Sequence, residues 1–137
     1  MARLLVVEDE REIRWIVVEL LQDAGYEVIA AASGHDASIL LHTMPGFDAL
    51  VTDIHMPGRL DGLALARLFR EQCPETPIVY VTGNPGALRD VRTRKHKDAV
   101  ILKPYRIAAL IGALQLLITA EGQTGGSAAG QGNLIAA

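Results

Sequence analysis

Five short apolar runs along the chain have the length and composition of buried strands. They hold few charged residues and show no apolar–polar alternation, which is typical of strands covered on both faces of a parallel sheet. The runs are Leu4–Val7, Tyr26–Ala31, Ala49–Thr52, Ile78–Val81 and Val100–Leu102.

Helical patterns occupy the segments that follow these runs. The first helix carries apolar residues at spacings of three and four, and Gly25 ends it. Further helices are expected in a segment opened by Ser33-Gly34, in Gly62–Glu71 after an Asp61 cap, in the basic segment Leu88–Lys97, and in Ile107–Ala120. Strand and helix therefore alternate. This alternation predicts an α/β fold: one doubly wound, five-stranded parallel sheet with five helices on its two faces.

Length and composition indicate one domain. Residues 1–121 suffice for a single core, and residues 122–137 form a Gly/Ala-rich tail that we expect to be disordered. The net charge of −3 gives no reason to expect nucleic-acid binding, and the single cysteine, Cys73, excludes an internal disulfide. No apolar run approaches the length of a membrane span, so we expect a cytoplasmic protein.

Chemically active side chains fall where the predicted strands end. Glu8 and Asp9 follow the first strand, Asp53 the third, Thr82 the fourth and Lys103 the fifth. The carboxyl ends of parallel strands share one edge of the sheet, so these residues can converge. Three neighbouring carboxylates repel one another unless a cation neutralises them, and an all-oxygen ligand set favours Mg²⁺ over zinc.

Such a group of residues is suited to phosphorylation. A carboxylate beside Mg²⁺ can attack a phosphoryl group to give an aspartyl phosphate, while Lys103 and the Thr82 hydroxyl contact the phosphoryl oxygens. Taken singly, Glu8-Asp9 could cap a helix, Asp53 and Thr82 could serve turns, and Lys103 could be a solvated charge. Their joint placement favours a phosphorylation site.

Four motifs resemble the receiver domain of bacterial two-component response regulators, of the stand-alone, single-domain type. They are Val6-Val7-Glu8-Asp9-Glu10, Asp53-Ile54-His55-Met56-Pro57-Gly58 with Asp61-Gly62, Val81-Thr82-Gly83, and Lys103-Pro104-Tyr105. The resemblance implies a flavodoxin-like sheet with strand order 2-1-3-4-5. It also implies a signalling module of a phosphorelay rather than an enzyme, with at most slow self-phosphorylation and self-dephosphorylation.

The resemblance assigns the metal ligands and the reacting group. Asp53 would be the phosphoacceptor, and Asp9 and Asp53 would bind Mg²⁺ directly. Glu8 would bind it through water, and His55 through its backbone carbonyl. The phosphodonor would be a histidine kinase or a histidine phosphotransfer protein. The signal would pass to a downstream protein by altered protein–protein binding, with no nucleic acid or membrane involved.

The resemblance also assigns roles at the fourth and fifth strands. Thr82 would be the switch hydroxyl and Lys103 the phosphate-binding lysine, with a cis peptide bond before Pro104. The chain departs from the family pattern at Val100, where an aromatic residue is usual, and at His96-Lys97-Asp98-Ala99, which replaces the usual Gly-Ala pair. These departures concern the region through which phosphorylation is read.

Two surface features and two other functions stay open. Trp15 either docks the phosphodonor or packs against a neighbouring loop. The basic residues Arg89, Arg92, Arg94, Lys95 and Lys97 either form a solvated face or meet an acidic partner.

The alternative functions are an aspartyl-phosphate-dependent phosphatase or phosphotransferase and a phosphorylation-independent, receiver-like interaction module. Arg11 and His55, two residues after Asp9 and Asp53, speak against the enzyme, which would place a second aspartate there.

Overall fold

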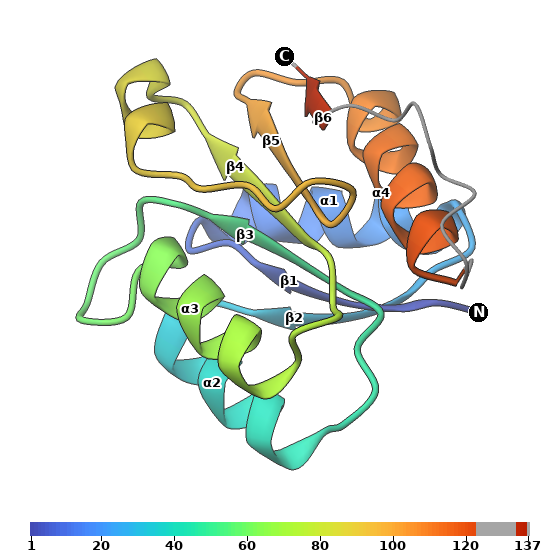
Figure 1. Ribbon diagram of the computed structural model, residues 1–137, viewed down its shortest axis with the longest axis horizontal. Coiled ribbons are helices and arrows are strands. Elements are labelled where there is room, and N and C mark those ends of the chain that lie inside the picture. Colours follow the sequence, from blue (N-terminus) through green and yellow to red (C-terminus); the bar gives the residue numbers. More distant parts are fainter. Residues whose placement is uncertain (123–133, 137) are drawn as a thin grey trace.

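The computed structural model describes residues 1–122 and 134–136. Its centre is a parallel sheet in the order β2-β1-β3-β4-β5-β6 (Figure 1). The strands are β1 Arg3–Val7, β2 Glu27–Ala31, β3 Ala49–Asp53, β4 Ile78–Thr82, β5 Asp98–Leu102 and β6 Leu134–Ala136. The first five lie in the predicted order 2-1-3-4-5, which confirms the predicted sheet.

In the described part of the chain, four α-helices cover the two faces of this sheet. They are α1 Arg11–Asp23, α2 Gly34–Thr43, α3 Gly62–Gln72 and α4 Ile107–Gly122. Figure 1 shows α2 and α3 together on one face and α1 and α4 on the other. Each face has its own apolar core. Leu5 and Val7 of β1 pack on the α2 and α3 side, while Leu4 and Val6 pack on the α1 and α4 side.

Local signals set the ends of the helices. The Ser33 hydroxyl accepts a hydrogen bond of 3.1 Å from the Asp36 N–H at the start of α2. The Asp61 carboxylate accepts one of 2.9 Å from the Ala64 N–H at the start of α3, which confirms the predicted cap. Gly25 follows α1 with φ of 99°, a conformation that favours glycine.

The predicted helix Leu88–Lys97 is wrong. A short 3-10 helix, η1, spans Pro85–Arg89, and the chain then runs without helix to β5. The cause is Asp98, which is buried at the start of β5 and accepts hydrogen bonds from the Arg94 N–H at 2.7 Å and from the Arg94 guanidinium. Arg94 is held by this buried carboxylate and by the carbonyls of Pro74 and Thr76, to which its guanidinium donates, and not by a continuous series of helical bonds.

The end of the chain differs from the expectation in part. Leu134–Ala136 forms β6, which pairs in parallel with β5 from Ala99 opposite Leu134 onward, although the sequence placed these residues in a disordered tail. Residues 123–133 and 137 of that predicted tail lie outside the described residues. The domain boundary after residue 121 stays a prediction. None of the helices in the described part combines the length and apolar character that a membrane span requires.

Candidate functional site

The sheet register brings the acidic residues to one edge. Val7 of β1 lies opposite Thr52 of β3, so Glu8, which follows β1, and Asp53, the last residue of β3, are neighbours at the carboxyl end of the sheet. Both side chains are buried. Carboxylate oxygens of Glu8, Asp9 and Asp53 lie within 4.8 Å of one another, and Asp9 is exposed on the open side. This cluster of three carboxylates suits a hard divalent cation.

Lys103 joins the two buried carboxylates. Its Nζ lies 2.9 Å from Asp53 Oδ1, 3.1 Å from Asp53 Oδ2 and 3.2 Å from Glu8 Oε1. Desolvation opposes the charge of Lys103, but the hydrogen bond and the negative charge of Asp53 outweigh it and raise the pKa of the ammonium group. The lysine therefore stays charged and holds both acids at this edge.

The two buried acids have different affinities for a proton. Burial, together with the Glu8 carboxylate and against the pull of Lys103, raises the pKa of Asp53 to about 7. Burial acts to raise the pKa of Glu8 as well, but the hydrogen bond from the Glu10 N–H and the nearby Asp53 and Lys103 outweigh it and lower that pKa. Burial is the largest cause of the raised pKa of Asp53, and the hydrogen bond and charge of Lys103 offset it only in part.

The fourth strand contributes a buried hydroxyl. Thr82 ends β4, and its Oγ accepts a hydrogen bond of 3.0 Å from the Asn84 N–H. The Lys103 N–H donates to the Thr82 carbonyl at 2.8 Å, so the ends of β4 and β5 are tied together beside the acids. The Lys103–Pro104 peptide bond is cis, as the resemblance implied.

His55 stands two residues after Asp53 in the sequence. It follows β3 in the loop after Ile54, and its side chain is exposed. The metal-binding role that the resemblance gives to its backbone carbonyl stays a prediction. The roles of Asp9, Asp53, Thr82 and Lys103 likewise stay predictions, although these residues do meet at one edge of the sheet.

Close backbone packing fixes the position of Asp53. The Gly62 N–H donates to the Ile54 carbonyl at 3.0 Å, and the Ile54 N–H donates to Val81 at 2.9 Å. A Cβ atom at Gly62 would lie 1.9 Å from the Asp53 carbonyl oxygen, so only glycine fits where α3 begins. The start of α3 therefore rests directly on the main chain of the candidate acceptor.

Sequence reasoning missed two residues that support the site. The Arg14 guanidinium donates a 2.9 Å hydrogen bond to the Glu8 carbonyl and so ties α1 to the end of β1. Tyr105 lines a small cavity below Glu8 and Asp53. Tyr105 belongs to the quoted Lys103-Pro104-Tyr105 motif, which could have suggested it. Arg14 carried no such signal, because its partner is a main-chain atom.

The structure bears on both open surface features. Trp15 is 64% exposed on α1, so no neighbouring loop covers it. It lines a shallow hollow of about 420 Å³ with Arg11, Arg14 and Val18 among its neighbours. Within the basic segment, Arg94 is bound to buried Asp98 and is not a solvated charge.

The chain is similar to known proteins over most of its length. The chain matches the model of the response regulator receiver domain over residues 4–115. It is 33% identical over 121 residues to the response regulator receiver protein CpdR of Brucella abortus, covering 88% of this chain and 99% of that protein. Several longer relatives match it over about half of their length.

Solved structures agree with that match. A response regulator receiver protein from Sinorhizobium medicae superposes with a TM-score of 0.81 and 30% identity, covering 88% of this chain and 96% of that one. The response regulator TrrA from Thermotoga maritima, in complex with Mg²⁺ and BeF, gives a TM-score of 0.74 and 28% identity, covering 85% and 99%.

Proposed function

Because the chain belongs to the response regulator receiver domain family, a family of signalling modules, we propose that it accepts a phosphoryl group on Asp53. The donor is a histidine kinase or a histidine phosphotransfer protein in the cytoplasm, and the output is altered binding to a downstream protein. The observation that carries the proposal is the position of Lys103, whose Nζ lies within 3.2 Å of both buried carboxylates of the cluster formed by Glu8, Asp9 and Asp53.

The proposed transfer is a displacement at phosphorus. An oxygen of the ionised Asp53 carboxylate forms a new bond to phosphorus, and the bond from phosphorus to the donor's histidine nitrogen breaks. The electron pair of that bond stays on the imidazole, which takes up a proton from solvent. Asp53 suits this role because burial strips its carboxylate of water, and because Lys103 lies beside both of its oxygens.

Lys103 and Thr82 would contact the phosphoryl group after its transfer to Asp53. Once Asp53 carries a phosphoryl group, Lys103 can pair with a phosphoryl oxygen while it keeps its contact with Glu8. The Thr82 hydroxyl, bonded to Asn84 in this state, can instead donate to another phosphoryl oxygen. If Thr82 gave up its hydrogen bond with Asn84, the loop after β4 would change its conformation. Phosphorylation of Asp53 would thereby alter the protein surface at this loop.

The acidic cluster fits Mg²⁺. Asp9 and Asp53 would hold the ion directly, Glu8 through water and His55 through its backbone carbonyl. The structure of TrrA, which is 28% identical to this chain, contains Mg²⁺ and so supports an ion of this kind. When bound, the ion supplies positive charge that offsets the charge on the phosphoryl oxygens. The pKa of Asp53, raised to about 7 by burial first and by the Glu8 carboxylate second, fits the same assignment, because a bound cation would favour the charged form of Asp53.

Incubation with a small phosphodonor tests this proposal. Intact mass measurement should show one phosphoryl adduct with Mg²⁺ and none after chelation. Asp53→Asn should abolish the adduct. Asp23→Asn, an exposed aspartate at the end of α1, controls for the loss of a charge and should keep it. An adduct of unchanged yield in Asp53→Asn would disprove the assignment.

A further inference from the structure

A cavity of about 220 Å³ lies between α3 and the segment that replaces the predicted fourth helix. It is lined by Leu63, Arg67, Arg70, Tyr80, Asp90 and Arg92. The first three residues are spaced by four and three along α3, so they share one face of that helix. Asp90 and Arg92 form the opposite wall, after η1. The cavity is separate from the acidic edge.

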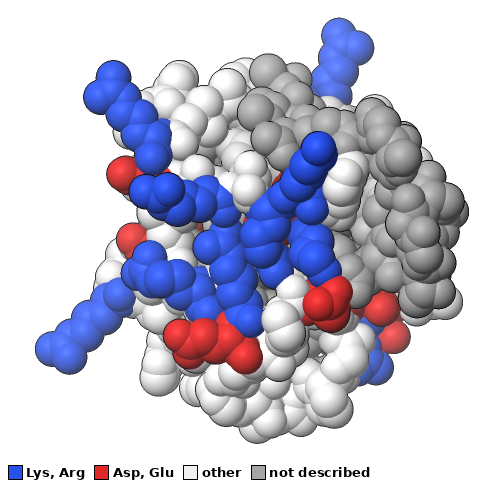
Figure 2. Space-filling view, viewed as in Figure 1, with Lys and Arg blue, Asp and Glu red and all other residues white. Residues whose placement is uncertain are grey.

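Positive charge dominates this cavity. Three guanidinium groups face one carboxylate, that of Asp90. In the part of the chain that the structure describes, neither the Arg67 nor the Arg92 side chain forms a hydrogen bond or ion pair, and both are exposed. In Figure 2, Lys and Arg side chains gather on this face over β4 and the segment that joins η1 to β5. Two guanidinium groups are therefore available to an incoming anion.

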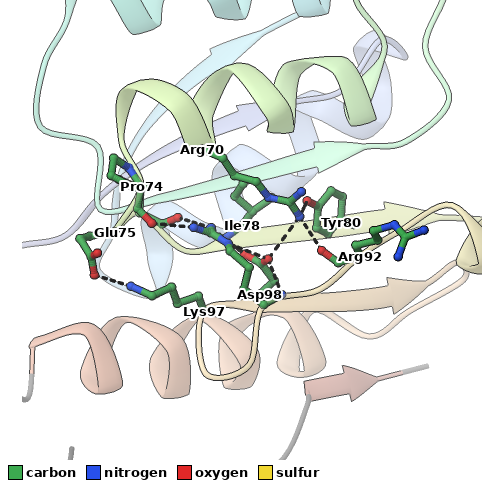
Figure 3. Close-up of polar contacts among 10 residues, drawn as sticks. Arg70, Pro74, Glu75, Ile78, Tyr80, Arg92, Lys97 and Asp98 are labelled. Carbon is green, nitrogen blue, oxygen red and sulfur yellow. Dashed lines mark hydrogen bonds and ion pairs between the residues drawn. The ribbon is translucent and has the colours of Figure 1, made fainter.

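The central arginine of the cavity is held rigidly. Arg70 reaches from α3 to donate through Nη2 to the Tyr80 hydroxyl and to the Arg92 carbonyl, each at 2.6 Å (Figure 3). Its guanidinium carbon lies 6.0 Å from the centre of the Tyr80 ring. The buried Nε of Arg70 has no hydrogen-bond partner among the described residues. The cavity thus combines a fixed cation with a buried donor that lacks an acceptor.

We propose that this cavity is a docking site for an acidic segment of a partner protein, which inserts one Asp or Glu side chain between Arg67 and Arg92. Its volume suits one carboxylate and falls below the range of pockets that hold drug-sized ligands. Guanidinium groups bind carboxylates through paired, charge-assisted hydrogen bonds. The chain's net charge of −3 opposes a nucleic acid as the partner.

The proposal concerns the output side of the proposed function but does not require phosphorylation, since the cavity is open in the structure. Its test uses the whole unphosphorylated chain without Mg²⁺. A failure here would leave phosphorylation of Asp53 intact, and a failure to phosphorylate would leave this site intact.

A labelled glutamate–serine peptide serves as the probe, compared with the same peptide carrying glutamine in place of glutamate. Binding of the acidic peptide should shift the amide resonances of α3 from Leu63 to Arg70 and those of Asp90–Arg92. Arg67→Gln and Arg92→Gln should each weaken binding about tenfold, the usual effect of losing a charge-assisted hydrogen bond. Both side chains are exposed, so the variants should unfold at the parent's denaturant midpoint.

Arg106→Gln is the matched control, because Arg106 is exposed just before α4 on the other face of the sheet and its loss removes the same charge. It should change affinity by less than about twofold. Equal weakening by Arg106→Gln would overturn the proposal in favour of diffuse attraction. Tighter binding of a single-stranded oligonucleotide, or the same resonance shifts from inorganic phosphate with none from the peptide, would overturn the protein partner.

Discussion

Tyr80 of β4 lies directly opposite Val100 of β5 in the parallel register, and both pack in the core on the α2 and α3 side of the sheet. The aromatic residue that the resemblance led us to expect on β5 is thus absent, while an aromatic side chain occupies the paired position on β4. Tyr80 also stands two residues before Thr82, so both side chains point to the same side of the sheet.

Tyr80 connects the core to the segment before β5. Its hydroxyl accepts from Arg70, and the same guanidinium nitrogen donates to the Arg92 carbonyl and lies 3.5 Å from Asp98. Tyr80 therefore holds a fixed position in a hydrogen-bond network, unlike an aromatic side chain that swings between two positions. Tyr80 and Arg70 therefore join β4 to the segment after η1.

Removing the Tyr80 hydroxyl should destabilise the protein. We expect Tyr80→Phe to lower the free energy of unfolding by about 1–2 kcal/mol, because Nη2 of Arg70 loses the Tyr80 hydroxyl as one of its acceptors. Urea unfolding at pH 7 measures this change. Tyr26→Phe is the control: Tyr26 is half-buried and its hydroxyl has no hydrogen-bond partner among the described residues, so its loss should change stability by less than about 0.5 kcal/mol. Equal effects of the two changes would contradict the network.

The same hydroxyl predicts a loss of stability in alkali. Burial, with the charge of Asp98 adding to it, raises the pKa of Tyr80 from 10.0 to about 12. The unfolded chain therefore releases this proton first. The stabilisation is complete below pH 10 and disappears as the pH rises through 12, a change of about 2 kcal/mol. Unfolding curves recorded from pH 9 to 12 should fall less steeply for Tyr80→Phe than for the parent protein.

Asp98 should be among the most sensitive positions outside the acidic edge. It is 1% exposed and accepts from Arg94 and from the Ile78 N–H, with Arg70 nearby. Asp98→Asn leaves two guanidinium groups without their counter-charge, and we expect it to cost about 3–5 kcal/mol. Amide exchange from Arg92 to Lys97 should accelerate as well. Asp90 is exposed, so Asp90→Asn should leave the free energy of unfolding and the amide exchange unchanged. An Asp98→Asn variant as stable as the parent would show that Asp98 does not hold this segment in place.

Asp98 also explains why the sequence pattern did not predict the conformation of the segment before β5. Arg94 and Asp98 are four residues apart, the spacing of an ion pair on a helix, yet they fix a segment without helix. Arg94 further donates to the carbonyls of Pro74 and Thr76, partners far away in the sequence. A pattern of apolar and charged positions cannot reveal such tertiary partners. The same holds for β6, which pairs with β5.

The sheet and the acidic edge were predictable for a different reason. Each strand is a run of residues that must be buried, and the first polar residue after such a run falls at the carboxyl end of the sheet. Glu8, Asp53 and Thr82 could therefore be placed together before any contact was known. Their individual partners, such as the Arg14 hydrogen bond to the Glu8 carbonyl, could not.

Two glycines in helices offer a matched pair of substitutions. Gly62→Ala places a Cβ 1.9 Å from the Asp53 carbonyl, so α3 must shift, and we expect a loss of about 1–3 kcal/mol. Gly112 lies within α4, and no atom of the described residues comes within 4 Å of its would-be Cβ, so Gly112→Ala should stabilise the protein by about 0.5–1 kcal/mol. Denaturant unfolding of both variants gives the signs. Stabilisation by Gly62→Ala would show that α3 does not rest on Asp53.

The central claim is that Asp53 is the residue that carries the phosphoryl group. Borohydride reduces an acyl phosphate to the alcohol, so it converts a phosphorylated aspartate into homoserine and marks the residue permanently. After treatment with a phosphodonor and Mg²⁺, sequencing of the peptides by mass spectrometry should find homoserine at position 53 and none when Mg²⁺ is chelated. Homoserine at Asp9, or at no aspartate of the acidic edge, would contradict the claim.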